Sequence, residues 1–271
     1  MRKIIYLLLI SLFIFSCGKK SNEISISNSK ETMLPKVDKT KPDRDKTDLK
    51  KENIVGKVKT MEENIGSATS KGDSIYLETI YDCYNKEYNE KGNYISEFPC
   101  WGSGMREGLE YFYDSKGILL KVEISNANGS TGNISYKRDE KGNITEEFSK
   151  SINERQPFVT SNKYNENGLI VNKVCGNEKY AIQYTYKYDK EGNKIEEYSE
   201  GRENNLIKFK YDERGNEIET ETEDLFVGSP KKIIKIKYSF DSKGNWIKKI
   251  EFDDNKPERI MERTFEYYVD N

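Results

Sequence analysis

The side chains able to do chemistry are unevenly represented in this sequence. Its 271 residues include 47 acidic side chains but no histidine. Without histidine, Ser-His-Asp and Cys-His nucleophilic sites and the HExxH zinc site are excluded. A glycosidase needs only two carboxylates, so a carboxylate-dependent hydrolase stays open as an alternative. The Asp and Glu residues recur at a near-constant period, however, which favours a solvated sheet face. We therefore expect no enzyme, no catalytic residues, no cofactor and no metal site.

Cys17 is the cysteine with the clearest chemical context. It follows a basic start, Arg2-Lys3, and an apolar run over residues 4–15. This run is too short to span a bilayer, which needs about 20 residues, and is typical of a secretory signal. Residues 14–18, IFSCG, resemble a bacterial lipobox, in which the cysteine becomes the lipid-modified first residue. We expect residues 1–16 to be a lipoprotein signal peptide and Cys17 to be the lipid attachment site.

The other cysteines are Cys83, Cys100 and Cys175. An exported chain can form disulfides. Cys83 and Cys100 flank one predicted hairpin and are the candidate pair, but its register sets Asp82 opposite Cys100. A direct bridge therefore requires a one-residue bulge, which the break at Pro99 could provide. Cys175 is then expected to be a half-buried free thiol.

Two tryptophans raise the question of sugar stacking. Trp101 lies in the glycine-flanked stretch Trp101-Gly102-Ser103-Gly104 and is the candidate binding residue. Trp246 is interpreted as structural, because the predicted hairpin register places it over Phe240.

The elements that must position these residues are best seen in the stretch 184–198, YTYKYDKEGNKIEEY. Tyr184 and two further tyrosines alternate with polar residues, which places them on one face of a strand. A turn starting at Asp189 follows, and Gly192 supplies the positive φ that a type I turn with a glycine bulge requires. We expect a β-hairpin with a three-residue loop in which Asp189 faces Asn193.

The hairpin motif occurs seven times in the sequence. The turn glycines are spaced by 25, 25, 26, 24, 23 and 29 residues. A near-fixed period indicates an array of supersecondary units, here one hairpin and one return connection each. We predict an all-β fold: a long, twisted antiparallel meander of about 14–16 strands. In the predicted register Phe240 faces Trp246, Tyr238 faces Lys248 and Tyr84 faces Phe98. The structural turn residues are Gly92, Gly117, Gly142, Gly168, Gly192, Gly215 and Gly244.

The seven motifs resemble the YD-repeat family, the Tyr-Asp-x-x-Gly repeat class of bacterial Rhs-type and wall-associated proteins. They are YNEKGN (88–93), YDSKGI (113–118), RDEKGN (138–143), YNENGL (164–169), YDKEGN (188–193), YDERGN (211–216) and FDSKGN (240–245). The resemblance covers roughly residues 54–269. It implies a repeat lipoprotein and names no activity. The chain is much shorter than the large Rhs proteins, so a shell that encloses a toxin is not expected.

Residues 17–53 are rich in Lys, Asp, Ser, Asn and Thr. Such a segment buries too little apolar surface to fold alone. We expect a disordered tether over 17–53, with a solvated charge run favoured over a short helix near residues 46–53, and a β domain over 54–271. The predicted function is a membrane-anchored scaffold or binding module of the bacterial cell envelope, at the outer membrane. Open alternatives are a binder of glycan or cell-wall polymer and an immunity or antitoxin partner. Expected partners are the membrane, through the lipid, and an envelope glycan or protein. No basic stripe indicates nucleic acid.

Overall fold

The computed structural model describes residues 46–100, 107–126, 128–176, 180–202 and 204–269. Within these residues the chain is all β apart from one short helix, α1 (Asp48–Lys51). The strands are antiparallel, and each pairs with the strands before and after it in sequence. They are β1 (Val58–Lys71), β2 (Ser74–Tyr88), β3 (Tyr94–Pro99), β4 (Gly108–Tyr113), β5 (Leu119–Asn126), β6 (Gly129–Arg138), β7 (Ile144–Ser151), β8 (Phe158–Tyr164), β9 (Ile170–Cys175), β10 (Ile182–Tyr188), β11 (Lys194–Glu200), β12 (Asn205–Tyr211), β13 (Glu217–Asp224), β14 (Lys232–Phe240), β15 (Trp246–Asp253) and β16 (Lys256–Tyr267).

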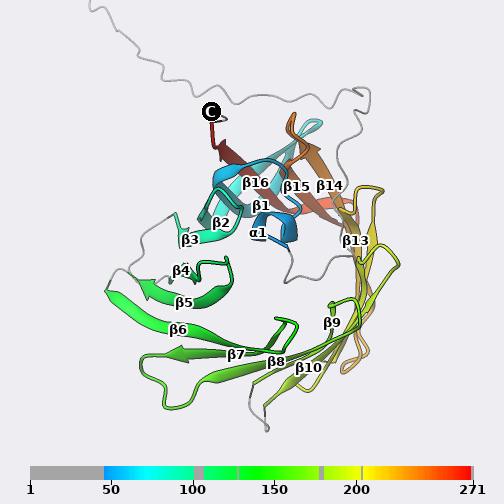
Figure 1. Ribbon diagram of the computed structural model, residues 1–271. Coiled ribbons are helices and arrows are strands. Elements are labelled where there is room, and N and C mark those ends of the chain that lie inside the picture. Colours follow the sequence, from blue (N-terminus) through cyan, green and yellow to red (C-terminus); the bar gives the residue numbers. More distant parts are fainter. Residues whose placement is uncertain (1–45, 101–106, 127, 177–179, 203, 270–271) are drawn as a thin grey trace, which may run out of the picture. The chain divides into compact units, whose positions relative to one another are not determined.

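The meander closes on itself. β1 pairs with β2 on one side and with β16 on the other, from Val58 opposite Tyr267 to Ser67 opposite Arg259. The sixteen strands thereby form one closed barrel (Figure 1). The predicted all-β meander of 14–16 strands is confirmed. The closure of the barrel was not predicted. The seam joins segments about 200 residues apart in the sequence, and no local pattern indicates that they pair.

The seven glycine turns have one geometry. The φ angles of their glycines lie between 74° and 92°, as predicted for this turn. In the fifth copy the Asp189 N–H donates to the Asn193 carbonyl at 2.9 Å. The Asp189 carboxylate accepts bonds from the backbone and side-chain amides of Asn193 at 2.8 and 2.7 Å. The aspartate therefore holds its own turn, as turn aspartates do. Because strands alternate in direction, all seven turns lie at one end of the barrel, the turn end.

The register inside each hairpin differs from the prediction by one residue. Phe240 faces Trp246 as expected, but Tyr238 faces Lys249 instead of Lys248. The cause is a bulge at Ile247, the third residue after the turn glycine, which has no partner in the ladder. All seven hairpins shift at this position. One extra residue exchanges the partners of the whole strand beyond it.

The bulge also explains the cysteine pair. In the first hairpin the extra residue is Ile95, so Tyr84 faces Pro99 and not Phe98. The Cys100 N–H then donates to the Cys83 carbonyl at 2.9 Å. The two residues are directly opposite each other, and they form a disulfide with a Cα–Cα distance of 5.3 Å. The bulge that this bridge requires therefore lies beside the turn and not at Pro99.

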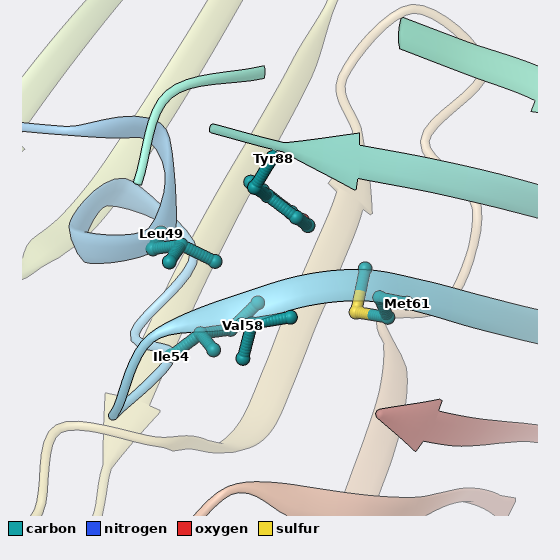
Figure 2. Packing of buried hydrophobic residues seen from close by; sticks show 5 residues of the cluster. All are labelled: Leu49, Ile54, Val58, Met61 and Tyr88. Carbon is teal, nitrogen blue, oxygen red and sulfur yellow. The ribbon is translucent and has the colours of Figure 1, made fainter. Parts of the chain in front are cut away.

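The main apolar cluster lies where the N-terminal segment meets the barrel. Leu49, Ile54, Val58, Met61 and Tyr88 are all buried and pack together (Figure 2). Leu49 belongs to α1, whereas Met61 and Tyr88 come from β1 and β2. The barrel face that carries these two side chains, and that faces α1, is called the inner face below.

The expectation of a solvated charge run over residues 46–53 is wrong. Thr47 caps α1, and Leu49 on that helix is 5% exposed. Burial of Leu49 and Ile54 fixes a segment whose composition alone favours disorder. Ordered structure thus begins before Ile54. The predicted signal peptide, Cys17, the tether before residue 46 and Trp101 lie outside the described residues. No helix in the described part of the chain is long and apolar enough to cross a membrane.

Candidate binding site at the turn end

Residues 47–56, here called the strap, connect the N-terminal region to β1 along the turn end. On one side the strap contacts the first two copies of the repeat. The Leu49 N–H donates to the Gly92 carbonyl at 3.0 Å. One carboxylate oxygen of Asp48 accepts bonds from the Tyr94 N–H at 2.9 Å and the Tyr113 hydroxyl at 3.1 Å. Burial and this carboxylate raise the pKa of Tyr113 above its usual value.

On its other side the strap contacts the last two copies. The Asn53 side chain donates to the side-chain oxygen of Asn216 at 3.2 Å. Asn245, which is 1% exposed, accepts from the Val55 N–H at 2.6 Å and donates to the Val55 carbonyl at 2.8 Å. The Asn245 side chain thus bonds both backbone groups of Val55, as a residue of a neighbouring strand would. The turn asparagines therefore hold a segment that composition alone would leave free.

A charged network lies beneath the strap on the inner face. Glu52 pairs with Lys86 at 3.1 Å and with Arg263 at 3.2 Å. Arg263 also pairs with Glu63 at 2.6 Å, and its guanidinium lies 3.6 Å from the centre of the Trp246 ring. Burial raises the pKa of the Glu52 carboxyl, and the two cations lower it only in part. Each acid here has a cationic partner, so the network fixes the strap to the barrel.

From the third copy onward, each copy is joined to the preceding one by a recurring contact, here called the clasp. A tyrosine hydroxyl donates to the backbone carbonyl two residues after the turn glycine of the preceding copy. In the last copy Phe240 occupies the motif position and cannot donate, so Tyr238 makes the bond instead. The clasps are Tyr164 to Ile144 (2.8 Å), Tyr188 to Ile170 (2.6 Å), Tyr211 to Lys194 (2.7 Å) and Tyr238 to Glu217 (2.9 Å).

The third copy replaces the tyrosine with arginine and keeps the clasp. Arg138 donates through Nη2 to the Leu119 carbonyl at 2.8 Å, two residues after Gly117. It also donates through Nη1 to the Gly142 carbonyl at 3.0 Å. A planar guanidinium can make both bonds at once and still carries a charge.

Two cavities adjoin the turns, one between the third and fourth copies and one chiefly between the second and third. The larger, about 450 Å³, is the open one between the third and fourth copies, with Asp139, Lys163 and Glu166 among its lining residues. The second, about 360 Å³, is here called the strap pocket, because α1 forms one wall. Its lining combines cationic, aliphatic, tyrosine and amide side chains. They include Lys46, Asp48, Lys51, Asn93, Tyr113, Ile118, Leu119, Arg138, Lys141, Asn143, Ile144 and Tyr164. Concave sites of this size with a few polar groups are typical of small-ligand binding.

The structure brings few of the sequence-predicted site residues together. Trp246 faces Phe240 and stacks on Arg263, which supports its structural interpretation. Cys175 is a partly exposed free thiol, 3.9 Å from the Thr160 hydroxyl. Sequence reasoning missed Arg138 and the strap. The signal for Arg138 was its departure from the aromatic residue that begins the other motifs. Within the described residues, no group of three or more His, Cys, Asp or Glu side chains is placed to hold a metal ion.

No protein-family model and no curated protein matches the chain. Solved structures are similar to it at low identity. A porin-like protein from Bacteroides uniformis matches with a TM-score of 0.51 and 10% identity, over 77% of this chain and 96% of that chain. A porin-like protein from Bacteroides vulgatus has a TM-score of 0.44 and 13% identity, over 76% and 97%. The Tc holotoxin pore from Photorhabdus luminescens has a TM-score of 0.32 and 13% identity, over 68% and 12%. The first similarity shows a shared fold and nothing finer, and the other two are too weak to support an argument.

Proposed function

We propose that this protein is a lipid-anchored binding module of the bacterial envelope that holds its ligand without catalysing a reaction. The observation that carries the proposal is the strap pocket. It lies where the strap meets the turns, and the strap directly continues the N-terminal segment that leads to Cys17. A lipid on Cys17 would therefore tether the chain at the end of the barrel that carries the pocket.

The carboxylates that recur in the sequence have structural partners, which supports a non-catalytic role. Asp139, Asp189, Asp212 and Asp241 accept backbone bonds inside their own turns. Catalytic acids need a site in which perturbed groups converge on a substrate. The repeated acids are spread along the turns instead.

We also infer that the array is a short member of the YD-repeat class. The support is that all seven motifs form the same hairpin, with a turn glycine of positive φ and a bulge three residues later. The ligand that fits a tethered envelope module best is an envelope polymer, because such polymers lie within reach of a membrane anchor.

The test has two parts. Labelled fatty acid should enter the wild-type protein and be absent from Cys17→Ser; equal labelling of both would remove the anchor. The chain from residue 17 onward, carrying Cys17→Ser, is then incubated with purified peptidoglycan and envelope polysaccharides. Retention without released products is expected. Products whose release is abolished by one Asp or Glu substitution would refute the non-catalytic role. Neither retention nor products would refute polymer binding and favour a protein partner.

A further inference from the structure

The strap pocket contains two cations without carboxylate partners. Four cationic side chains line it, Lys46, Lys51, Arg138 and Lys141, together with one carboxylate, that of Asp48. Asp48 already pairs with Lys51 at 2.9 Å. Arg138 bonds backbone carbonyls, and Lys141 extends from an exposed turn position. Neither Arg138 nor Lys141 forms an ion pair with any residue that the structure describes.

This concentration of charge is unusual for the molecule. The chain as a whole has a formal charge of −2, and several of its strand lysines face glutamates across the ladder, as Lys137 faces Glu146 at 3.0 Å. A partly enclosed cavity with unpaired cations attracts anions more strongly than an open surface does, because its walls reduce solvent screening.

Two departures from the repeat consensus meet in this pocket. Arg138 stands where the other motifs have an aromatic residue, and a tyrosine at that position makes the same clasp elsewhere. The fold therefore does not need a charge there. Ile118 stands where five motifs have asparagine, and it is 44% exposed. A solvent-facing aliphatic side chain in place of a turn amide gives the pocket an apolar wall, which Leu119 and Ile144 extend.

We infer that the strap pocket binds an acidic sugar unit, whose carboxylate or phosphate contacts Arg138 and Lys141 and whose apolar ring face lies against Ile118. This inference rests on the proposed polymer-binding function and names the chemistry of the ligand. An arginine offers two parallel N–H donors to such an anion, and a lysine adds a point charge. Asn93 supplies an amide able to bond sugar hydroxyls.

The inference is tested by calorimetric titration of the chain from residue 17 onward, carrying Cys17→Ser. The probes are glucuronate, glucose 6-phosphate and glucose, which compare a carboxylate, a phosphate and no charge on one ring. Binding of either anion is expected to be at least about tenfold tighter than that of glucose, and to weaken with salt. Equal binding of all three probes would overturn the assignment.

Matched variants separate ligand contact from folding. Arg138→Tyr restores the consensus and keeps a hydroxyl for the clasp, so its denaturation midpoint should be unchanged while anion affinity falls about tenfold. Ile118→Asn, also a return to consensus, should weaken the sugars but not inorganic phosphate. Lys141→Ala should resemble Arg138→Tyr, whereas Lys91→Ala, at the equivalent turn position of the first copy, should bind normally. Unchanged affinity in Arg138→Tyr and Lys141→Ala would refute the site. If polymer retention persists while no anionic probe binds, this inference fails and the proposed function stands.

Discussion

Removal of single tyrosine hydroxyls should give opposite results at two chemically similar positions. The Tyr188 hydroxyl donates to the Ile170 carbonyl at 2.6 Å and joins the fifth copy to the fourth. Tyr88 begins the first copy, which has no preceding turn. Its side chain is fully buried, and its hydroxyl has no hydrogen-bond partner. The same Tyr→Phe change therefore deletes a bond at one position and an unsatisfied group at the other.

The expected magnitudes follow from these partners. Tyr188→Phe loses a neutral hydrogen bond and should lower the free energy of unfolding by about 1 kcal/mol. This bond is only partly buried, so the cost should stay near that figure. Tyr88→Phe removes a buried polar group without a partner, so it should be neutral or stabilise by about 1 kcal/mol.

The assay is urea denaturation of the two variants and the wild type, followed by circular dichroism. Both variants should keep the wild-type dependence of the unfolding free energy on urea, so that shifts in midpoint report stability alone. Tyr211→Phe, which deletes another clasp, serves as the matched control and should behave like Tyr188→Phe. If Tyr88→Phe is destabilised as much as the clasp variants, the partner assignment that underlies this reasoning is wrong.

Three further predictions concern the turns, the disulfide and alkaline pH. Gly192→Ala places a side chain at a φ of 82° and should destabilise by about 1 kcal/mol or more in the same assay. Reduction of the Cys83–Cys100 bridge, which links residues 17 apart, should cost about 3 kcal/mol, measured as a lowered denaturation midpoint with reductant; no shift would contradict a contribution of the bridge to stability. Burial raises the pKa of Tyr267 to about 12, whereas an unfolded tyrosine ionises near pH 10. The unfolded state therefore releases this proton first. The contribution of Tyr267 to the free energy of unfolding is fully present below about pH 10 and is lost as the pH rises to about 12. Urea midpoints and tyrosinate absorbance, measured over this pH range, would follow the loss. Tyr267→Phe should reduce this alkaline loss.

Local turn chemistry was predictable because it depends on a few adjacent residues. Positive φ at Gly192 and the bond between Asp189 and Asn193 follow from the motif alone. The bulge at the third residue after each glycine was not predictable in the same way. A hydrophobic residue such as Ile247 fits either register, and only pairing with the neighbouring hairpins decides between them.

The strap and its pocket could not be predicted, because their contacts are long-range. The bond from Val55 to Asn245 spans 190 residues, and α1 is too short to be stable without the barrel. A composition rich in Lys and Asp predicts disorder, because the sequence alone does not show the barrel surface on which the strap packs. The sequence shows that Arg138 departs from the motif. It does not show the pocket that Arg138 forms with Ile118 and α1, because only the fold brings these residues together.

The seam between β1 and β16 has a consequence for the chain while it is being synthesised. Among the described strands β16 is made last, and until it arrives β1 and the newest strand each have one unpaired edge. Every shorter nascent chain therefore presents two open strand edges at once, and such edges favour pairing with other chains. Deletion of β16 would return the barrel to that state, because β1 would lose its second partner strand. Pairing along this one seam, more than the strength of any single repeat, therefore decides whether open strand edges are available for aggregation.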